Sequence, residues 1–174
     1  DSKKKNFINT VISGAPFGSL LLYKEMDKFL LVDGLQRYST LKDFILYPNN
    51  YINLYDDCIS TITDIIQFMQ SNINVITNFK TLEREIFSLI KDNFSLNKDV
   101  GEMANSIISN LPVVLETDNS TLLHIQMLIN QMLLGIKNRY NIYELYIPVI
   151  IYHGEYNKLP DIFENVNSTG TTLN

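Results

Sequence analysis

The sequence contains no tryptophan and a single cysteine, Cys58, among its 174 residues. One cysteine excludes an internal disulfide and any zinc site built from several cysteines. The two histidines, His124 and His153, lie far apart, and neither has a ligand-type neighbour at helical spacing. We interpret His124, which lies on an apolar helical pattern, as a core residue. The sequence gives no support for zinc chemistry.

Long apolar runs and several well-known motifs are also missing. A membrane-spanning helix needs about 20 consecutive apolar residues, and neither such a run nor a signal peptide is visible, so we expect a cytoplasmic protein with no membrane partner. The motifs of nucleotide-binding P-loops, dinucleotide-binding folds, zinc proteases and serine hydrolases are absent. The net charge of −5 argues against broad, nonspecific attraction to nucleic acid.

The chain can bury one good core, because about 45% of its residues are hydrophobic. We therefore expect one domain over residues 1–174. It begins at "DSKKKNF" without a methionine and stops at "STGTTLN", so we expect a domain truncated at both ends.

Apolar periodicity predicts strands near 20–23, 29–32 and 145–151 in one small mixed sheet, and helices elsewhere. This is an α+β pattern. Residues 1–55 and 141–174 form its motif-bearing part, and residues 56–140 form a helical insertion. The insertion follows from the long interval between the second and third strands.

Two elements have more specific expectations. The segment "LYIPVIIYHG" is apolar throughout and predicts an interior strand, with Pro148 leaving one edge unpaired. The segment "ETDNSTLLHIQMLINQMLLGIKNRY" predicts the longest helix, with Asp118 to Ser120 as N-cap candidates. It is apolar nearly all round, which predicts a buried central helix.

The segment "FLLVDGLQRYSTLKDFI" predicts a strand, a tight turn and a helix. Asp33 and Gln36 have the spacing of a capping box, and Gly34 eases the turn. Local structure does not explain Arg37, because the first turn of a helix disfavours a cation. A strand leading through glycine into a helix also binds phosphate, and an arginine adds forked donors there. The spacing leaves both interpretations open, as well as a structural role in which Arg37 is buried against a carboxylate such as Asp33 or Asp43.

The segment "LPDIFENVNSTGTTLN" predicts a helix of about two turns followed by a polar loop. Asn167, Ser168 and Thr169 would bring amide and hydroxyl groups together in that loop, and Gly170 would turn the chain. Alone, this pattern also fits an ordinary helix end.

Together the two segments resemble the N-terminal domain family of GmrSD-type, modification-dependent restriction endonucleases, also called domain of unknown function 262. The family shows a "DGQQR-x-T-T-L" stretch, and this chain has "DGLQRYSTL", with Leu35 in place of the first glutamine. Near its end the family shows "IF-x-x-[IL]-N-x-x-G-x-x-L", which is matched here by Ile162, Phe163, Asn167, Gly170 and Leu173.

The resemblance implies a ParB/sulfiredoxin-like fold whose DGQQR turn binds the phosphates of a nucleoside triphosphate (NTP) and supports its hydrolysis. It implies catalytic roles for Asp33, Gln36 and Arg37, with a magnesium ion at Asp33 and the nucleotide bound by Gly34, Arg37, Asn167, Thr169 and Gly170.

The leading hypothesis is therefore a nucleotide-binding, NTP-hydrolysing regulatory domain of a DNA restriction or phage-defence protein. No nuclease motif is present in this sequence, so DNA would be reached through the full-length protein or through a nuclease domain or partner. The alternative is a non-enzymatic ParB-like module for protein or DNA contacts, in which "DGLQR" only caps a helix. A nuclease in its own right is the weakest alternative.

Overall fold

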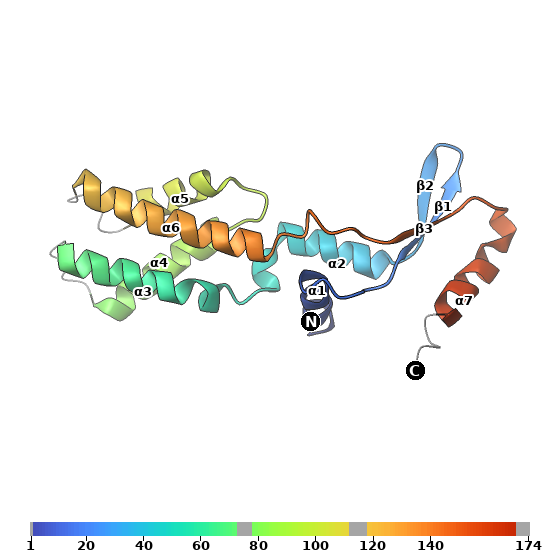
Figure 1. Ribbon diagram of the computed structural model, residues 1–174, viewed down its shortest axis with the longest axis horizontal. Coiled ribbons are helices and arrows are strands. Elements are labelled where there is room, and N and C mark those ends of the chain that lie inside the picture. The colour runs from blue at the N-terminus through green and yellow to red at the C-terminus, as the bar shows by residue number, and fades with distance from the viewer. Residues whose placement is uncertain (1, 73–77, 112–117, 170–174) are drawn as a thin grey trace. The chain divides into compact units, whose positions relative to one another are not determined.

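The computed structural model describes residues 2–72, 78–111 and 118–169 of the chain (Figure 1). The chain divides into two compact units, which are described separately: residues 1–42 with 142–174 form unit 1, and residues 43–141 form unit 2. The described residues contain one three-stranded mixed sheet and seven α-helices. The prediction of a mainly helical α+β fold is confirmed.

The sheet belongs to unit 1, and its strand order is β2-β1-β3. Its strands are β1 (Leu20–Glu25), β2 (Lys28–Asp33) and β3 (Val149–Tyr152). β1 and β2 form an antiparallel hairpin, whose turn contains Met26 at a φ of 52°. β1 and β3 pair in parallel, with Leu20 opposite Val149. The prediction that three distant segments form one sheet is confirmed.

β3 corrects one prediction, because the interior strand of the described sheet is β1. β3 begins at Val149 and lies at an edge of the sheet. Val149, Ile150 and Ile151 are each more than 40% exposed, on alternating faces of the strand. An unbroken apolar run predicts burial. In the described sheet, however, no further strand pairs with the outer edge of β3, and most of its side chains are exposed on both faces. Pro148, just before the strand, accepts a hydrogen bond from the backbone of Leu20 at 2.9 Å.

Two helices accompany the hairpin in sequence, namely α1 (Ser2–Ile12) and α2 (Leu35–Leu46). α1 buries Ile8 and Val11, which are both 1% exposed. The predicted apolar face of α2 is only partly buried: Leu41 and Phe44 are covered, whereas Tyr38 is 49% exposed. The first turn of α2 is the segment in which sequence analysis places Arg37.

Unit 2 is a bundle of four helices, which lie side by side in Figure 1. α3 packs against α4 and α6, and α5 packs against the same two helices. α3, α4 and α5 each bury a row of apolar residues at helical spacing. The elements of unit 2 are η1 (Pro48–Asn50), α3 (Leu54–Asn72), α4 (Phe79–Asn93), α5 (Val100–Ser109) and α6 (Asn119–Arg139).

α6 is the longest described helix, as predicted, but it is not buried all round. Ile125, Ile129 and Leu133 face the core, whereas Leu123 is 66% exposed and Leu134 is 51% exposed. Within the described bundle α6 packs mainly against α3 and α5, so one face stays open. His124 stacks on Phe68 with ring centroids 4.2 Å apart, but it is only half-buried, so it lies at the edge of the core and not inside it as predicted.

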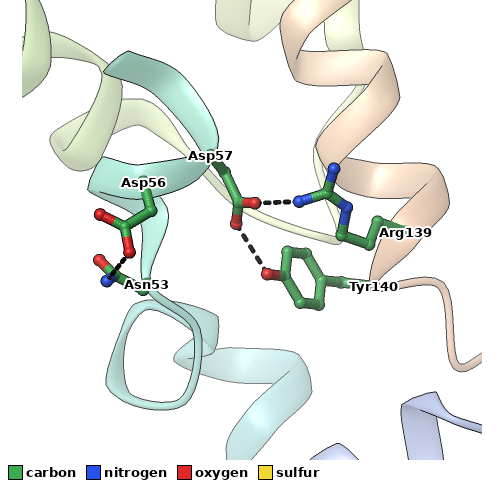
Figure 2. A network of polar contacts seen from close by, with 5 residues as sticks. All are labelled: Asn53, Asp56, Asp57, Arg139 and Tyr140. Carbon is green, nitrogen blue, oxygen red and sulfur yellow. Dashed lines mark hydrogen bonds and ion pairs between the residues drawn. The ribbon is translucent and has the colours of Figure 1, made fainter. Parts of the chain in front are cut away.

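A polar network joins the start of α3 to the end of α6 (Figure 2). The carboxylate of Asp57, whose side chain is 8% exposed, pairs with the guanidinium of Arg139. It also accepts a hydrogen bond of 2.7 Å from the hydroxyl of Tyr140. Burial, followed by the Asp57 carboxylate, raises the pKa of Tyr140 to about 12, so this hydroxyl stays protonated and donates. Both charges also suit the dipoles of their helix ends.

Next to this network, Cys58 is fully buried in the core of the bundle. Burial, followed by the nearby charge of Asp57, raises the pKa of the Cys58 thiol to about 12. A thiol with so high a pKa is neutral at physiological pH, so Cys58 packs as a small apolar side chain.

α6 starts at the predicted N-cap, where Asp118 accepts hydrogen bonds from the backbone of Ser120 and Thr121. The bond from the Ser120 hydroxyl is the largest cause that lowers the pKa of Asp118, to about 2 from its ordinary 3.8. A lowered pKa adds stability that is present above pH 4 and lost as the pH falls towards 2. We expect Asp118→Asn, which keeps a capping oxygen, to remove this part of the acid sensitivity. Urea unfolding between pH 5 and 2, with wild type beside the variant, measures it; equal pH slopes would contradict the assignment.

The end of unit 1 corrects a further prediction. After η3 (Tyr156–Lys158), helix α7 runs over Leu159–Thr169. Asn167 and Thr169 are therefore helical, whereas a polar loop was expected there. Asn, Ser and Thr cost no more than about 0.7 kcal/mol each in a helix, so the apolar residues before them can carry the helix through them.

Candidate functional site

The turn from β2 to α2 is shaped by a bulge and a glycine. The register between β1 and β2 shifts between Leu21 and Leu22, which leaves Val32 as the extra residue of β2. Gly34 follows with a φ of 95°. A Cβ at Gly34 would lie 2.3 Å from Cδ2 of Leu20, so the turn needs glycine for its space as well as its backbone conformation.

Arg37 folds back over this turn. Its Nη2 donates to the Asp33 carboxylate at 2.7 Å and to the carbonyl of Ser19 at 2.9 Å. Gly18 leaves room for the guanidinium, since a Cβ there would lie 3.0 Å from Nη1. The Nε of Arg37 is buried and has no hydrogen-bond partner among the described residues. Arg37 therefore anchors the turn, and it retains one unmet donor.

These contacts decide between two of the local interpretations. The Asp33 side chain accepts from Arg37, and no capping bond from it to the start of α2 is found in the described residues. The pairing of Arg37 with Asp33 is confirmed. Both side chains are 30% exposed, so solvent reaches the pair and screens it.

A pocket of about 400 Å³ lies between α1 and α2. Lys3, Lys4 and Phe7 line it from α1. Gln36, Arg37, Ser39 and Thr40 line it from α2. The pocket thus combines three cationic side chains with amide and hydroxyl groups, and none of the described residues that line it is acidic. This composition suits an anion with several oxygens.

The same composition does not suit a metal ion bound by protein alone. Asp33 is not among the lining residues, and one of its oxygens is already paired with Arg37. No group of three or more Asp, Glu, His or Cys that could hold a metal ion occurs in the described part of the chain. Magnesium at Asp33 stays a prediction, and it draws no support from this geometry.

The structure brings four of the predicted site residues together. It does not describe the side chains of the others. These four residues lie at the turn from β2 to α2. Asp33 ends β2 and Gly34 follows it, whereas Gln36 and Arg37 lie in the first turn of α2. Asn167 and Thr169 lie in the last turn of α7, where only the backbone is described. Gly170 lies outside the described residues. Their predicted convergence with Arg37 stays a prediction.

Sequence analysis missed the contribution of α1. Lys3 and Lys4 are part of the run "KKK", which reads as a solvated helix end. Only the packing of α1 beside α2 shows that two of its lysines share a pocket with Arg37. The sequence does carry one signal for this pocket: Lys3, Lys4 and Arg37 each lie in the first turn of a helix, where the helix dipole disfavours a cation.

The chain was compared with families, curated proteins and solved structures. A family model described as "GmrSD restriction endonuclease, N-terminal domain" matches residues 1–174. The chain belongs to this family. No curated protein and no solved structure matches it, so the finer ParB/sulfiredoxin-like likeness stays a prediction.

Membership of the GmrSD family places the chain in the context of DNA restriction, as predicted. No helix in the described residues is long and apolar enough to span a membrane. The turn with the family's "DGQQR" pattern is the one whose arginine lines the cationic pocket.

Proposed function

We propose that this GmrSD N-terminal domain binds a nucleoside triphosphate, with the phosphates in the pocket between α1 and α2, and that it hydrolyses the nucleotide to regulate DNA restriction. The observation that carries the proposal is the pocket itself, in which Lys3, Lys4 and Arg37 converge without a lining acid. The negative charge of a triphosphate would complement the positive charge of these side chains.

The start of α2 supports the same ligand. Its first backbone N–H groups have no partner within the helix, and the helix dipole adds positive potential there. Gln36 and Arg37 lie in this first turn and line the pocket. A phosphate at this position would face the helix end and the charged side chains at once. It would also relieve the repulsion among the three cations.

In this proposal, each predicted catalytic residue has a distinct role. Arg37, which lines the pocket, would bind phosphate, while its pair with Asp33 fixes its direction. Gln36 is exposed and lies one residue before Arg37, where its amide would orient the attacking water. Magnesium would arrive with the nucleotide and shield the charge of its phosphates.

The charge-reversing substitution Lys4→Glu tests the proposal without disturbing the anchor at Arg37. Lys4 is exposed, so the variant is expected to fold normally. It loses a charge-assisted contact of about 1.5–3 kcal/mol. Affinity for NTP in the full-length protein should fall roughly ten- to a hundred-fold. Isothermal calorimetry with each of the four NTPs measures the affinity, and phosphate release measures the hydrolysis.

Lys5→Glu is the matched control, because Lys5 is exposed on the same helix but does not line the pocket. Like Lys4→Glu, it changes the net charge by two units and replaces a cation near the start of α1 by an anion. We expect its NTP affinity to stay within about two-fold of wild type, since exposed charges at a distance are screened. Equal losses for both variants, or no NTP binding by wild type, would reject the phosphate site.

A further inference from the structure

Unit 1 holds a second pocket, of about 570 Å³, between the hairpin and the α7 region. Tyr23, Leu30 and Val32 line it from the hairpin. Tyr156, Asn157 and Phe163 line it from η3 and α7. None of the described residues that line it is charged. Its size lies within the range of sites for small molecules, and its wall is mainly apolar and aromatic, as in such sites.

The aromatic rings of this pocket remain open to a ligand. Tyr156 is 67% exposed and Phe163 is 39% exposed. The rings of Tyr156 and Tyr23 meet edge to face, with centroids 5.6 Å apart, so the Tyr156 ring is held in place while much of it stays uncovered. Leu30 adds an exposed aliphatic surface beside them. Contiguous apolar surface that stays exposed often marks a binding site.

The end of β2 connects this pocket with the proposed phosphate site. Three consecutive residues of β2 line the aromatic pocket, namely Leu30, Leu31 and Val32, and Val32 is the extra residue of the bulge. Asp33 and Gly34 follow immediately. Gln36 and Arg37, which line the proposed phosphate pocket, come next after Leu35, so one short segment of the chain contributes to both pockets.

We propose that the aromatic pocket binds the base of the nucleotide whose phosphates the α1–α2 pocket holds, an inference that rests on the proposed function. A base is neutral and planar, so it stacks on exposed aromatic rings at no cost in buried charge. The side-chain amide of Asn157 offers both a donor and an acceptor to the edge of the base. The residues around Asn157 would therefore set which of the four bases is preferred.

Three probes separate the two pockets in the full-length protein: NTP, inorganic tripolyphosphate and the free nucleoside. We expect Tyr156→Ala to weaken NTP binding roughly ten-fold, because it removes one stacking surface. Binding of tripolyphosphate should not change, since that probe has no base. The nucleoside should shift the NMR signals of Tyr156 and Phe163 in wild type, and it should lose most of its affinity in the variant.

Two variants serve as controls. Tyr146→Ala removes the same side chain from a position that is 96% exposed and does not line the pocket, so it should leave NTP affinity unchanged. Tyr156→Phe keeps the ring and should restore NTP affinity to within about two-fold of wild type. The circular dichroism spectrum of Tyr156→Ala should match that of wild type, because the residue is mostly exposed.

The outcomes distinguish this inference from the proposed function. If tripolyphosphate binds but Tyr156→Ala weakens NTP no more than Tyr146→Ala does, the base site is wrong and the phosphate site stands. If tripolyphosphate does not bind, the phosphate site fails, and with it the shared ligand. A ten-fold effect on NTP with none on tripolyphosphate supports both sites.

Discussion

Gly34→Ala is expected to destabilise unit 1 by about 3 kcal/mol. The φ of 95° strains any residue that has a Cβ, at a cost of about 1–3 kcal/mol. The new methyl group would also lie 2.3 Å from Cδ2 of Leu20, and moving that side chain disturbs the packing of β1. Urea unfolding gives the loss in free energy, and hydrogen exchange at the amides of β1 and β2 assigns it to unit 1.

Gly14→Ala separates backbone strain from crowding. Gly14 has a φ of 71°, but no atom lies within 4 Å of the position of its Cβ. It should therefore lose only the backbone part, about 1 kcal/mol. If the two variants lose the same free energy, Leu20 adapts freely and crowding does not hold the turn. If neither variant loses stability, the two glycines do not need a positive φ.

Asp57→Ala is expected to destabilise the helical bundle by about 2 kcal/mol. The hydrogen bond from Tyr140 to a charged acceptor contributes about 1.5–3 kcal/mol. The pair with Arg139 adds no more than about 1 kcal/mol, because the Arg139 side chain is 63% exposed. Removing Asp57 leaves no charge buried, since Arg139 can turn to solvent. The free energy of unfolding, measured by urea, reports the loss.

Asp56→Ala is the matched control, because Asp56 also lies in the first turn of α3 but is exposed. Both variants remove one negative charge from the same helix end and lose the same dipole interaction. Asp56 also accepts an exposed hydrogen bond from the side-chain amide of Asn53, so the difference between the variants gives a lower bound on the contacts with Arg139 and Tyr140. In Tyr140→Phe, Asp57→Ala should cost about 1.5 kcal/mol less than in wild type, because the hydrogen bond is already gone. Identical costs in both backgrounds would show that the hydrogen bond to Tyr140 contributes nothing.

The sequence predicts those parts of the fold in which one segment decides its own structure. Apolar residues at helical spacing give α3, α4 and α5 their buried faces, and Asp118 marks the start of α6. Exposure is harder to predict, because it depends on neighbours distant in sequence. β3 is apolar throughout, and α6 is apolar nearly all round, yet the described neighbours leave β3 uncovered and one face of α6 open.

The site shows the same limit. The turn at Asp33, Gly34 and Arg37 can be read from local rules, because a strand, a glycine and a helix follow one another. The role of Lys4 cannot, since it depends on α1 packing beside α2. The bulge at Val32 is equally hidden, because register is a property of two strands and not of one.

The burial of Cys58 gives this protein a built-in probe. Burial raises the pKa of the Cys58 thiol to about 12, so the thiol is neutral at pH 7, and the folded bundle also blocks access to it. A thiol-specific reagent will therefore modify only molecules in which the bundle has opened. Because Cys58 is the sole cysteine of the sequence, the rate of modification reports one event at one place. The opening equilibrium of the helical unit can thus be followed in native buffer, without denaturant and without an introduced label.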